Sequence, residues 1–137
     1  MRVVLDTSVI VAAPRSRRGP ANRVMRMVAE REITPVATPS VFIEYEEVLK
    51  RAEQRLSHGL SMMQIDDFLT ELAALVDPVE VHYQWRPQLR DPGDEMILEA
   101  AINGHADVVV TYNIRDFADV ERMFGIRIAA PVELLRR

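Results

Sequence analysis

The 137-residue chain has no cysteine, a single lysine and only five glycines. Without cysteine it forms neither disulfides nor thiolate-bound zinc sites, a composition that suits the reducing cytoplasm. No apolar stretch approaches the roughly 20 residues that a helix needs to span a bilayer. Asp6 also interrupts the N-terminal apolar run before the hydrophobic region of a signal peptide could form. We therefore expect a cytoplasmic protein that does not insert into a membrane.

The scarcity of lysine and glycine restricts the possible phosphate chemistry. The glycines are scattered, and neither the GxxxxGK nor the GxGxxG pattern of a nucleotide-binding loop occurs. An aspartyl-phosphate enzyme needs a lysine at a late strand end, whereas Lys50 lies within a predicted helix. The haloacid-dehalogenase pattern needs a second aspartate two residues after Asp6, where this chain has Ser8. Phosphotransfer through an aspartyl nucleophile is therefore disfavoured.

The net charge of −4 argues against nucleic-acid binding through the overall electric field, because such binding depends on basic residues neutralising phosphates. Any contact with nucleic acid must be local. Sixteen of the 17 basic residues are arginine, and Arg15, Arg17 and Arg18 lie together in the predicted loop RSRRGP. These three are candidates for phosphate contacts, with an ordinary solvated loop as the alternative.

The remaining composition is that of a globular protein, with 48% hydrophobic and 28% charged residues. A chain of this length fits one domain, which removes roughly two-thirds of the unfolded chain's surface from water. We expect a single domain over residues 1–137.

Apolar runs bounded by turn or cap residues predict a series of short strands. These are expected at residues 2–5, 33–37, 79–82, 106–111 and 126–130. Helical periodicity and capping signals predict intervening helices at residues 21–32, 39–56, 61–76, 92–103 and 132–136. Because the strands alternate with helices and several are uniformly apolar, we predict an α/β fold. Its central parallel sheet has about five strands flanked by helices on both faces.

The apolar strand MRVVL delivers an aspartate, Asp6, at its end, followed by Thr7 and Ser8. Ligands of open parallel sheets bind beyond the carboxyl ends of the strands, which is where Asp6 is expected. The alternative is that Asp6 caps a helix beginning at Ser8 or Val9.

Glu44 lies in the predicted helix that follows the second strand. At about 100° per residue it falls close to the Val41 and Val48 edge of the apolar stripe, where an unpaired carboxylate costs free energy. A partly exposed residue that reaches solvent is the alternative.

Two further acidic positions are expected at helix starts on the same edge of the sheet. Asp94 falls at the third position of the helix that begins with the Asp91-Pro92 pair, where an acid favours helix capping. Asp116 follows the strand that ends near Thr111, and a cap is again the alternative.

The joint placement of Asp6, Glu44, Asp94 and either Asp116 or Asn113 is harder to explain than any one of them. Gathered carboxylates repel one another, and either raised pKa values or a bound cation relieves the repulsion. Oxygen ligands select a hard divalent ion, so Mg²⁺ or Mn²⁺ is implied.

Four stretches resemble PIN-domain ribonucleases, in particular the VapC-like toxins of toxin–antitoxin pairs. They are VVLDTSVIVAA, PSVFIEYEEVLKR, LRDPGDEMILEAAINGHADVVVTYNIRDF and GIRIAAPVELL, in the family's order over nearly the whole chain. The resemblance implies a parallel sheet flanked by helices. It carries the family's acidic site onto Asp6, Glu44 and Asp94. Many relatives have a fourth aspartate where this chain has Asn113, and Asp116 is the next acid.

The resemblance further implies metal-dependent endonucleolytic cleavage of RNA. Asp6 and Asp94 would ligate Mg²⁺ or Mn²⁺, with Glu44 and Asp116 completing the ligand set or acting through water. Relatives commonly form homodimers and bind an antitoxin protein, so both partners are expected. The alternative is a catalytically silent PIN module that binds RNA or a protein partner, and Asn113 in place of an acid keeps that alternative open.

Overall fold

The structure, a computed structural model, describes residues 1–82 and 91–136. The strands are β1 (Arg2–Leu5), β2 (Thr34–Ala37), β3 (Asp77–Pro78), β4 (Val108–Val110) and β5 (Arg127–Ala129). The α-helices are α1 (Thr7–Ala12), α2 (Pro20–Ala29), α3 (Pro39–Lys50), α4 (Ala52–His58), α5 (Met62–Leu75), α6 (Pro92–Asn103), α7 (Ala118–Phe124) and α8 (Pro131–Leu134). Two 3-10 helices, η1 (Ala13–Arg15) and η2 (Ile114–Phe117), extend α1 and precede α7.

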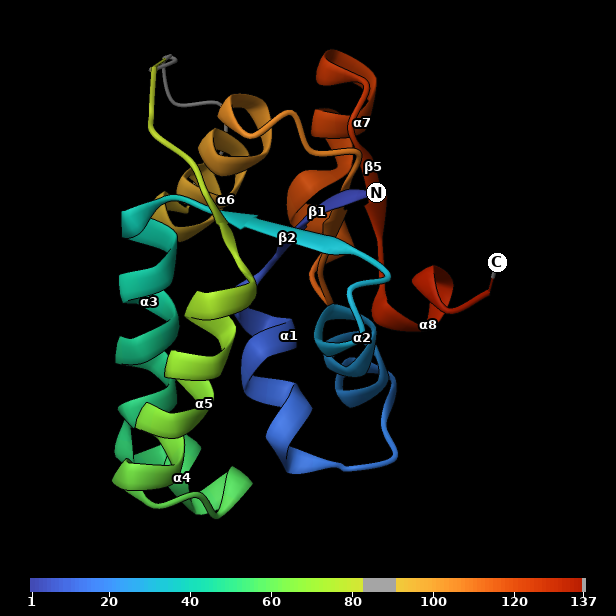
Figure 1. Cartoon of the computed structure of the whole chain (residues 1–137). Coiled ribbons are helices and arrows are strands. Elements are labelled where there is room, and N and C mark those ends of the chain that lie inside the picture. Colours follow the sequence, from blue (N-terminus) through green and yellow to red (C-terminus); the bar gives the residue numbers. More distant parts are fainter. Residues whose placement is uncertain (83–90, 137) are drawn as a thin grey trace.

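The five strands form one sheet in the order β3-β2-β1-β4-β5, and every pairing is parallel. Helices α6 and α7 lie on one side of the strands and α1 and α2 on the other (Figure 1). The predicted α/β fold with a parallel sheet flanked on both faces is therefore confirmed. β1 lies at the centre of the sheet, so its carboxyl end is surrounded by the ends of its neighbours.

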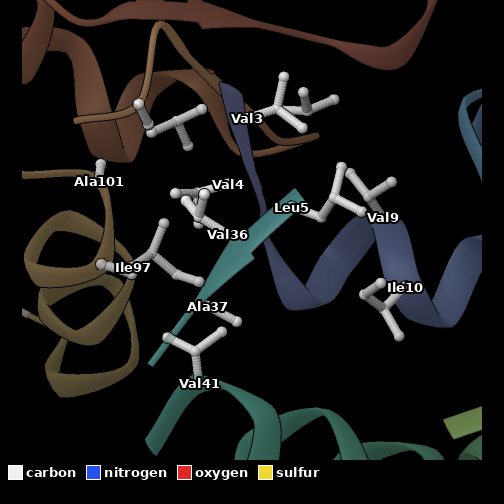
Figure 2. Close-up of a cluster of buried hydrophobic side chains, with 14 of the residues drawn as sticks. Val3, Val4, Leu5, Val9, Ile10, Val36, Ala37, Val41, Ile97 and Ala101 are labelled. Atoms are coloured by element: carbon white, nitrogen blue, oxygen red, sulfur yellow. The ribbon is translucent and has the colours of Figure 1, made fainter. Parts of the chain in front are cut away.

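The centre of the sheet is apolar on both faces because helices cover both. Val3, Val4 and Leu5 are almost completely buried, which explains why this strand lacks an alternation of polar and apolar residues. Figure 2 shows Val4 and Val36 facing Ile97 of α6, whereas Leu5 faces α1. The two-residue period of the strand therefore places the next side chain, that of Asp6, on the α6 side.

One predicted strand is wrong. Residues 79–82 are not a strand, and the edge strand β3 is Asp77–Pro78. The amide of Val79 still donates to the carbonyl oxygen of Ala37 at 3.0 Å, but β2 ends there and α3 begins. With no neighbouring strand left to pair with, the chain departs, and the amide of His82 donates to the side chain of Asn103.

The single helix predicted over residues 39–56 is also wrong, because the backbone of Arg51 is extended (φ −62°, ψ 140°) and separates α3 from α4. The helix predicted at residues 21–32 ends at Ala29, since Arg31 adopts the left-handed conformation (φ 61°). In contrast, the predicted capping box of Ser61 with Gln64 opens α5. The bounds predicted for α6 are those observed.

In the part of the chain that the structure describes, no helix has both the length and the apolar character needed to cross a membrane.

Candidate active site at the carboxyl edge of the sheet

Asp6 is a buried carboxylate at the carboxyl end of the central strand. Its backbone amide donates to the carbonyl oxygen of Val110 at 2.9 Å, which continues the pairing of β1 with β4. Only 5% of the residue is exposed. Asp6 stands at the N-cap position of α1, but its side chain makes no capping hydrogen bond. Helix capping therefore does not account for the buried carboxylate.

Two hydroxyl groups hold the Asp6 side chain in place. The Oγ of Ser8 and the Oγ1 of Thr111 each donate to Oδ2 of Asp6 at 2.7 Å. The same hydroxyl oxygens also accept hydrogen bonds from backbone amides. The amide of Tyr112 donates to the Ser8 hydroxyl at 3.2 Å, and the amide of Asn113 donates to the Thr111 hydroxyl at 2.9 Å. Because each oxygen already accepts an N–H, its own proton is directed at the carboxylate. This network orients Asp6 before any ligand binds.

Tyr45 of α3 also belongs to this region, although no sequence motif pointed to it. Its hydroxyl donates to the carbonyl oxygen of Leu5 and connects α3 to the last residue of β1. Burial, together with the negative charge of Asp6, raises the pKa of the Tyr45 hydroxyl, which stays a neutral donor. The signal available in the sequence was general: a buried tyrosine hydroxyl needs a hydrogen-bond partner.

Asp94 lies in the first turn of α6, at the third helical residue, as predicted. Partial burial raises the pKa of Asp94 to about 6, and the negative charges of Asp91, Asp6 and Asp116 add to the rise. Asp91 itself caps α6, its Oδ1 accepting from the amide of Gly93 at 2.7 Å. Four aspartates from the end of β1, the start of α6 and η2 thus act on one another, and we call them the carboxylate edge: Asp6, Asp91, Asp94 and Asp116.

Asp116 lies in η2 and Asn113 at its N-cap, and both side chains are exposed. The amide of Asp116 donates to the carbonyl oxygen of Asn113 at 3.0 Å, so the two residues form one turn after Thr111. The negative charge of Asp116 contributes to the raised pKa of Asp94. Asn113 is neutral, and its backbone amide donates a hydrogen bond to the hydroxyl of Thr111.

Glu44 is partly buried on α3, next to Tyr45. It is not among the charges that raise the pKa of Asp94. The structure therefore places Asp6 and Asp116 where their charges act on Asp94, and it places Glu44 on α3 beside Tyr45.

The carboxylate edge fits a hard divalent cation by its chemistry, because every donor is a carboxylate oxygen. Across residues 1–82 and 91–136, no arginine or lysine forms an ion pair with Asp6, Asp94 or Asp116, so their mutual repulsion is not offset by protein cations. Within the same residues, no three histidine, aspartate or glutamate side chains form a ready-made metal-binding group. The donor chemistry is suitable, and the side chains are not drawn together into a closed ligand set.

These features define an α/β domain with a carboxylate site at the carboxyl edge of a parallel sheet. A family model described as the PIN domain matches residues 2–115, which is most of the chain. The protein belongs to the PIN-domain family.

The fold is also similar to that of a solved structure. One similar protein chain occurs in the crystal structure of VapBC2 from Rickettsia felis, which is bound to a DNA fragment from the VapBC2 promoter. Its TM-score to this chain is 0.59, and the two sequences are 17% identical. The alignment covers 93% of this chain and 97% of that chain. At this level of identity the similarity establishes a shared fold. No curated protein sequence matches the chain significantly.

Proposed function

We propose that this PIN-domain protein is a metal-dependent endoribonuclease that acts in the cytoplasm as the toxin of a toxin–antitoxin pair. The observation that carries the proposal is the oriented, buried carboxylate of Asp6 beside the charges of Asp94 and Asp116. Family membership supports the same conclusion, and the resemblance of this chain to VapC-like toxins supplies RNA as the substrate.

Each acidic residue has a distinct role in this proposal. Asp6, held by Ser8 and Thr111, is the fixed ligand of Mg²⁺ or Mn²⁺. Asp94 is the second ligand, and its pKa is raised first by burial and then by neighbouring carboxylates whose charge a cation would offset. We assign Glu44 and Asp116 to the outer part of the ligand set, where water completes the coordination. When bound, the cation supplies a water of lowered pKa and neutralises charge that develops on the phosphate.

The test is cleavage of an end-labelled, structured RNA by the purified protein with Mn²⁺. The Asp6→Asn variant should lose at least about 100-fold in rate, because the fixed ligand loses its charge. Asp119→Asn is the matched control, since Asp119 lies on the exposed surface of α7 and its side chain is 74% accessible. Circular dichroism and the thermal midpoint establish that both variants are folded. Equal cleavage by Asp6→Asn and wild-type protein would contradict the proposal.

A catalytically silent PIN module is the second candidate, favoured by the neutral Asn113 in the turn after Thr111. A silent module binds RNA or a protein partner without cutting. In the same assay it would leave the RNA intact with wild-type protein and with both variants. Retention of the labelled RNA on a filter then distinguishes a binding module from an inert protein.

We further propose an antitoxin partner and a homodimer. The similar structure is named as VapBC2 bound to promoter DNA. In this chain, two adjoining pockets share Asn22, Met25, Phe68 and Glu71 and form a groove between α2 and α5. Its apolar floor suits apolar side chains of a partner segment.

The partner is tested by co-purification with the product of a neighbouring gene. Phe68→Glu should abolish co-purification, because a charge replaces the apolar floor of the groove, whereas Ile43→Glu on the exposed face of α3 should not. Sedimentation of the chain alone tests the homodimer. A protein that sediments as a monomer at all concentrations would contradict that part.

A further inference from the structure

A second charged region lies at the far end of α1 from Asp6. Between Thr7 and Ala29 the sequence contains five arginines and no acidic residue. Three of these arginines, Arg15, Arg17 and Arg18, are exposed in and beside the turn that follows η1. This stretch of the sequence is thus strongly basic in a protein whose net charge is −4.

Helix α4 and its N-cap residue add two more arginines to the same region. The guanidinium of Arg15 donates to the side-chain oxygen of Gln54 in α4. Arg51 lies three residues before Gln54 and Arg55 directly after it, and both are exposed. Arg51 is the N-cap residue of α4, and its carbonyl oxygen accepts from the amide of Gln54 at 3.1 Å, so both residues belong to the first turn of this helix. Figure 1 shows α4 and the end of α1 at the same end of the molecule. We define this basic end as Arg15, Arg17, Arg18, Arg51 and Arg55.

The backbone of the loop is held while its arginine side chains project. The side-chain amide of Asn22 donates to the carbonyl oxygen of Ala13 at 3.0 Å. The guanidinium of Arg26 donates to the carbonyl oxygen of Arg17 and, at 3.2 Å, to the side chain of Asn22. Two side chains of α2 therefore fix both sides of the turn, which lowers the entropy cost of ordering the loop when a ligand binds.

The guanidinium groups of the basic end are available to an anion. None of its arginines forms an ion pair within the ranges 1–82 and 91–136. Glu53 is the one acidic residue between positions 51 and 58. Arginine presents a planar set of donors that matches a phosphate in two-point contacts, a geometry that lysine lacks. A repeating phosphate backbone fits such a spread of guanidinium groups better than a single small anion does.

The separation of the two charged regions fits a strand that touches both. Six residues of α1 and three of η1 rise by about 15 Å in total. At the axial rise of about 3.4 Å per nucleotide in a stacked strand, this distance corresponds to about four nucleotides. We infer that the basic end binds the phosphates of an RNA strand about four nucleotides from the bond held at the carboxylate edge. The inference takes its substrate class from the proposed function.

The test measures how the protein binds a fluorescein-labelled single-stranded RNA of about 20 nucleotides. Binding is monitored by fluorescence anisotropy at several salt concentrations. EDTA is present so that binding is measured without cleavage. Two double variants, Arg17→Gln with Arg18→Gln and Arg51→Gln with Arg55→Gln, each remove two positive charges. Arg122→Gln with Arg127→Gln is the matched control, because these exposed arginines lie on α7 and at the start of β5.

Each double variant should bind the RNA about tenfold or more weakly at low salt. The slope of log affinity against log salt should fall by about 1.4 in magnitude, since each lost contact with a single strand contributes about 0.7. The control pair should retain the wild-type slope. Wild-type affinity and slope in both test variants would overturn the inference.

A second probe separates RNA from an acidic protein segment. A labelled polyglutamate peptide should bind weakly and equally to wild-type protein and all variants. Tight peptide binding that both test pairs lose, with unchanged RNA binding, would assign the basic end to an acidic protein instead. The proposed function fails separately, through an absence of cleavage with Mn²⁺, because the binding assay does not depend on catalysis.

Discussion

The carboxylate edge and the basic end lie at opposite ends of α1 and are built in contrasting ways. The carboxylate edge draws Asp6, Asp94 and Asp116 from three distant parts of the chain, and Asp6 is buried. The basic end draws exposed arginines from one short loop and one short helix. The acidic region therefore depends on the folded core, whereas the basic region is a surface feature supported by a few local hydrogen bonds.

This difference predicts that substitutions at the two regions affect different quantities. Changes at Asp6 and its hydrogen-bond partner Thr111 should alter the free energy of unfolding as well as activity, because both residues are buried and bonded to each other. Changes at the basic end should alter RNA affinity and leave stability almost unchanged.

The largest effect on stability is expected for Thr111→Val. The substitution keeps the side-chain shape but removes the hydroxyl that donates to Asp6 and accepts from the amide of Asn113. A lost hydrogen bond to a charged group costs about 2 kcal/mol in the free energy of unfolding, measured by urea denaturation. Thr70→Val is the control, because the Thr70 hydroxyl is exposed and bonds only to its own helix. Equal losses in both variants would show that the Asp6 network contributes nothing.

Tyr45→Phe should have the next largest effect. It removes the donor to the carbonyl oxygen of Leu5, which joins α3 to the end of β1. We expect a loss of about 1 kcal/mol, since a buried acceptor is left without that bond. Tyr112→Phe changes the same group at an exposed position, 46% accessible, and should be neutral. A neutral Tyr45→Phe variant would show that another donor replaces the hydroxyl.

Asp94→Asn should stabilise the metal-free protein in a pH-dependent way. The folded state raises the pKa of Asp94 from 3.8 to about 6, so folded protein binds this proton more tightly than unfolded protein does. Ionisation of Asp94 thus costs stability as the pH rises from about 4 to 6, and the full cost is present above that range. The variant avoids this cost and should gain about 1 kcal/mol above pH 6, after allowance for screening at a partly exposed site.

The gain from Asp94→Asn should vanish below about pH 4, where both states are protonated. Urea denaturation in EDTA at a series of pH values measures it, with Asp119→Asn on the exposed surface as the control. A gain that is the same at every pH would rule out the electrostatic explanation.

The smallest effect is expected for Arg17→Gln combined with Arg18→Gln. Both side chains are exposed, and neither makes a side-chain hydrogen bond or ion pair in the described part of the chain. The free energy of unfolding should change by less than about 0.5 kcal/mol. The free energy of unfolding can be measured on the same protein preparation that is used for RNA binding. A large loss of stability would mean that the basic end is structural.

Most of the fold could be predicted because its signals are local. The Asp91-Pro92 pair and Gly104 mark the ends of α6, and Ser61 with Gln64 opens α5. The break at Arg51 was missed because the apolar periodicity runs on through it, and no proline or glycine marks the change. The position of β3 was missed because the end of its neighbour β2, rather than its own apolar residues, limits the pairing.

The acidic site was predictable in part for the same reason. The positions of Asp6 after β1 and of Asp94 in the first turn of α6 follow from strand and helix boundaries. The role of Tyr45 was not predictable, because it depends on how α3 packs against the end of β1.

Local spacing, turn residues and caps were enough to establish a parallel α/β domain and to place its aspartates at element ends, because those signals act over a few neighbouring residues. Only the tertiary structure decided that Thr111, 105 positions away, donates to Asp6, and that Asp6 and Asp116 act on Asp94. These contacts depend on the strand order that places β4 beside β1, and pairing between distant strands is set by the packing of the whole sheet.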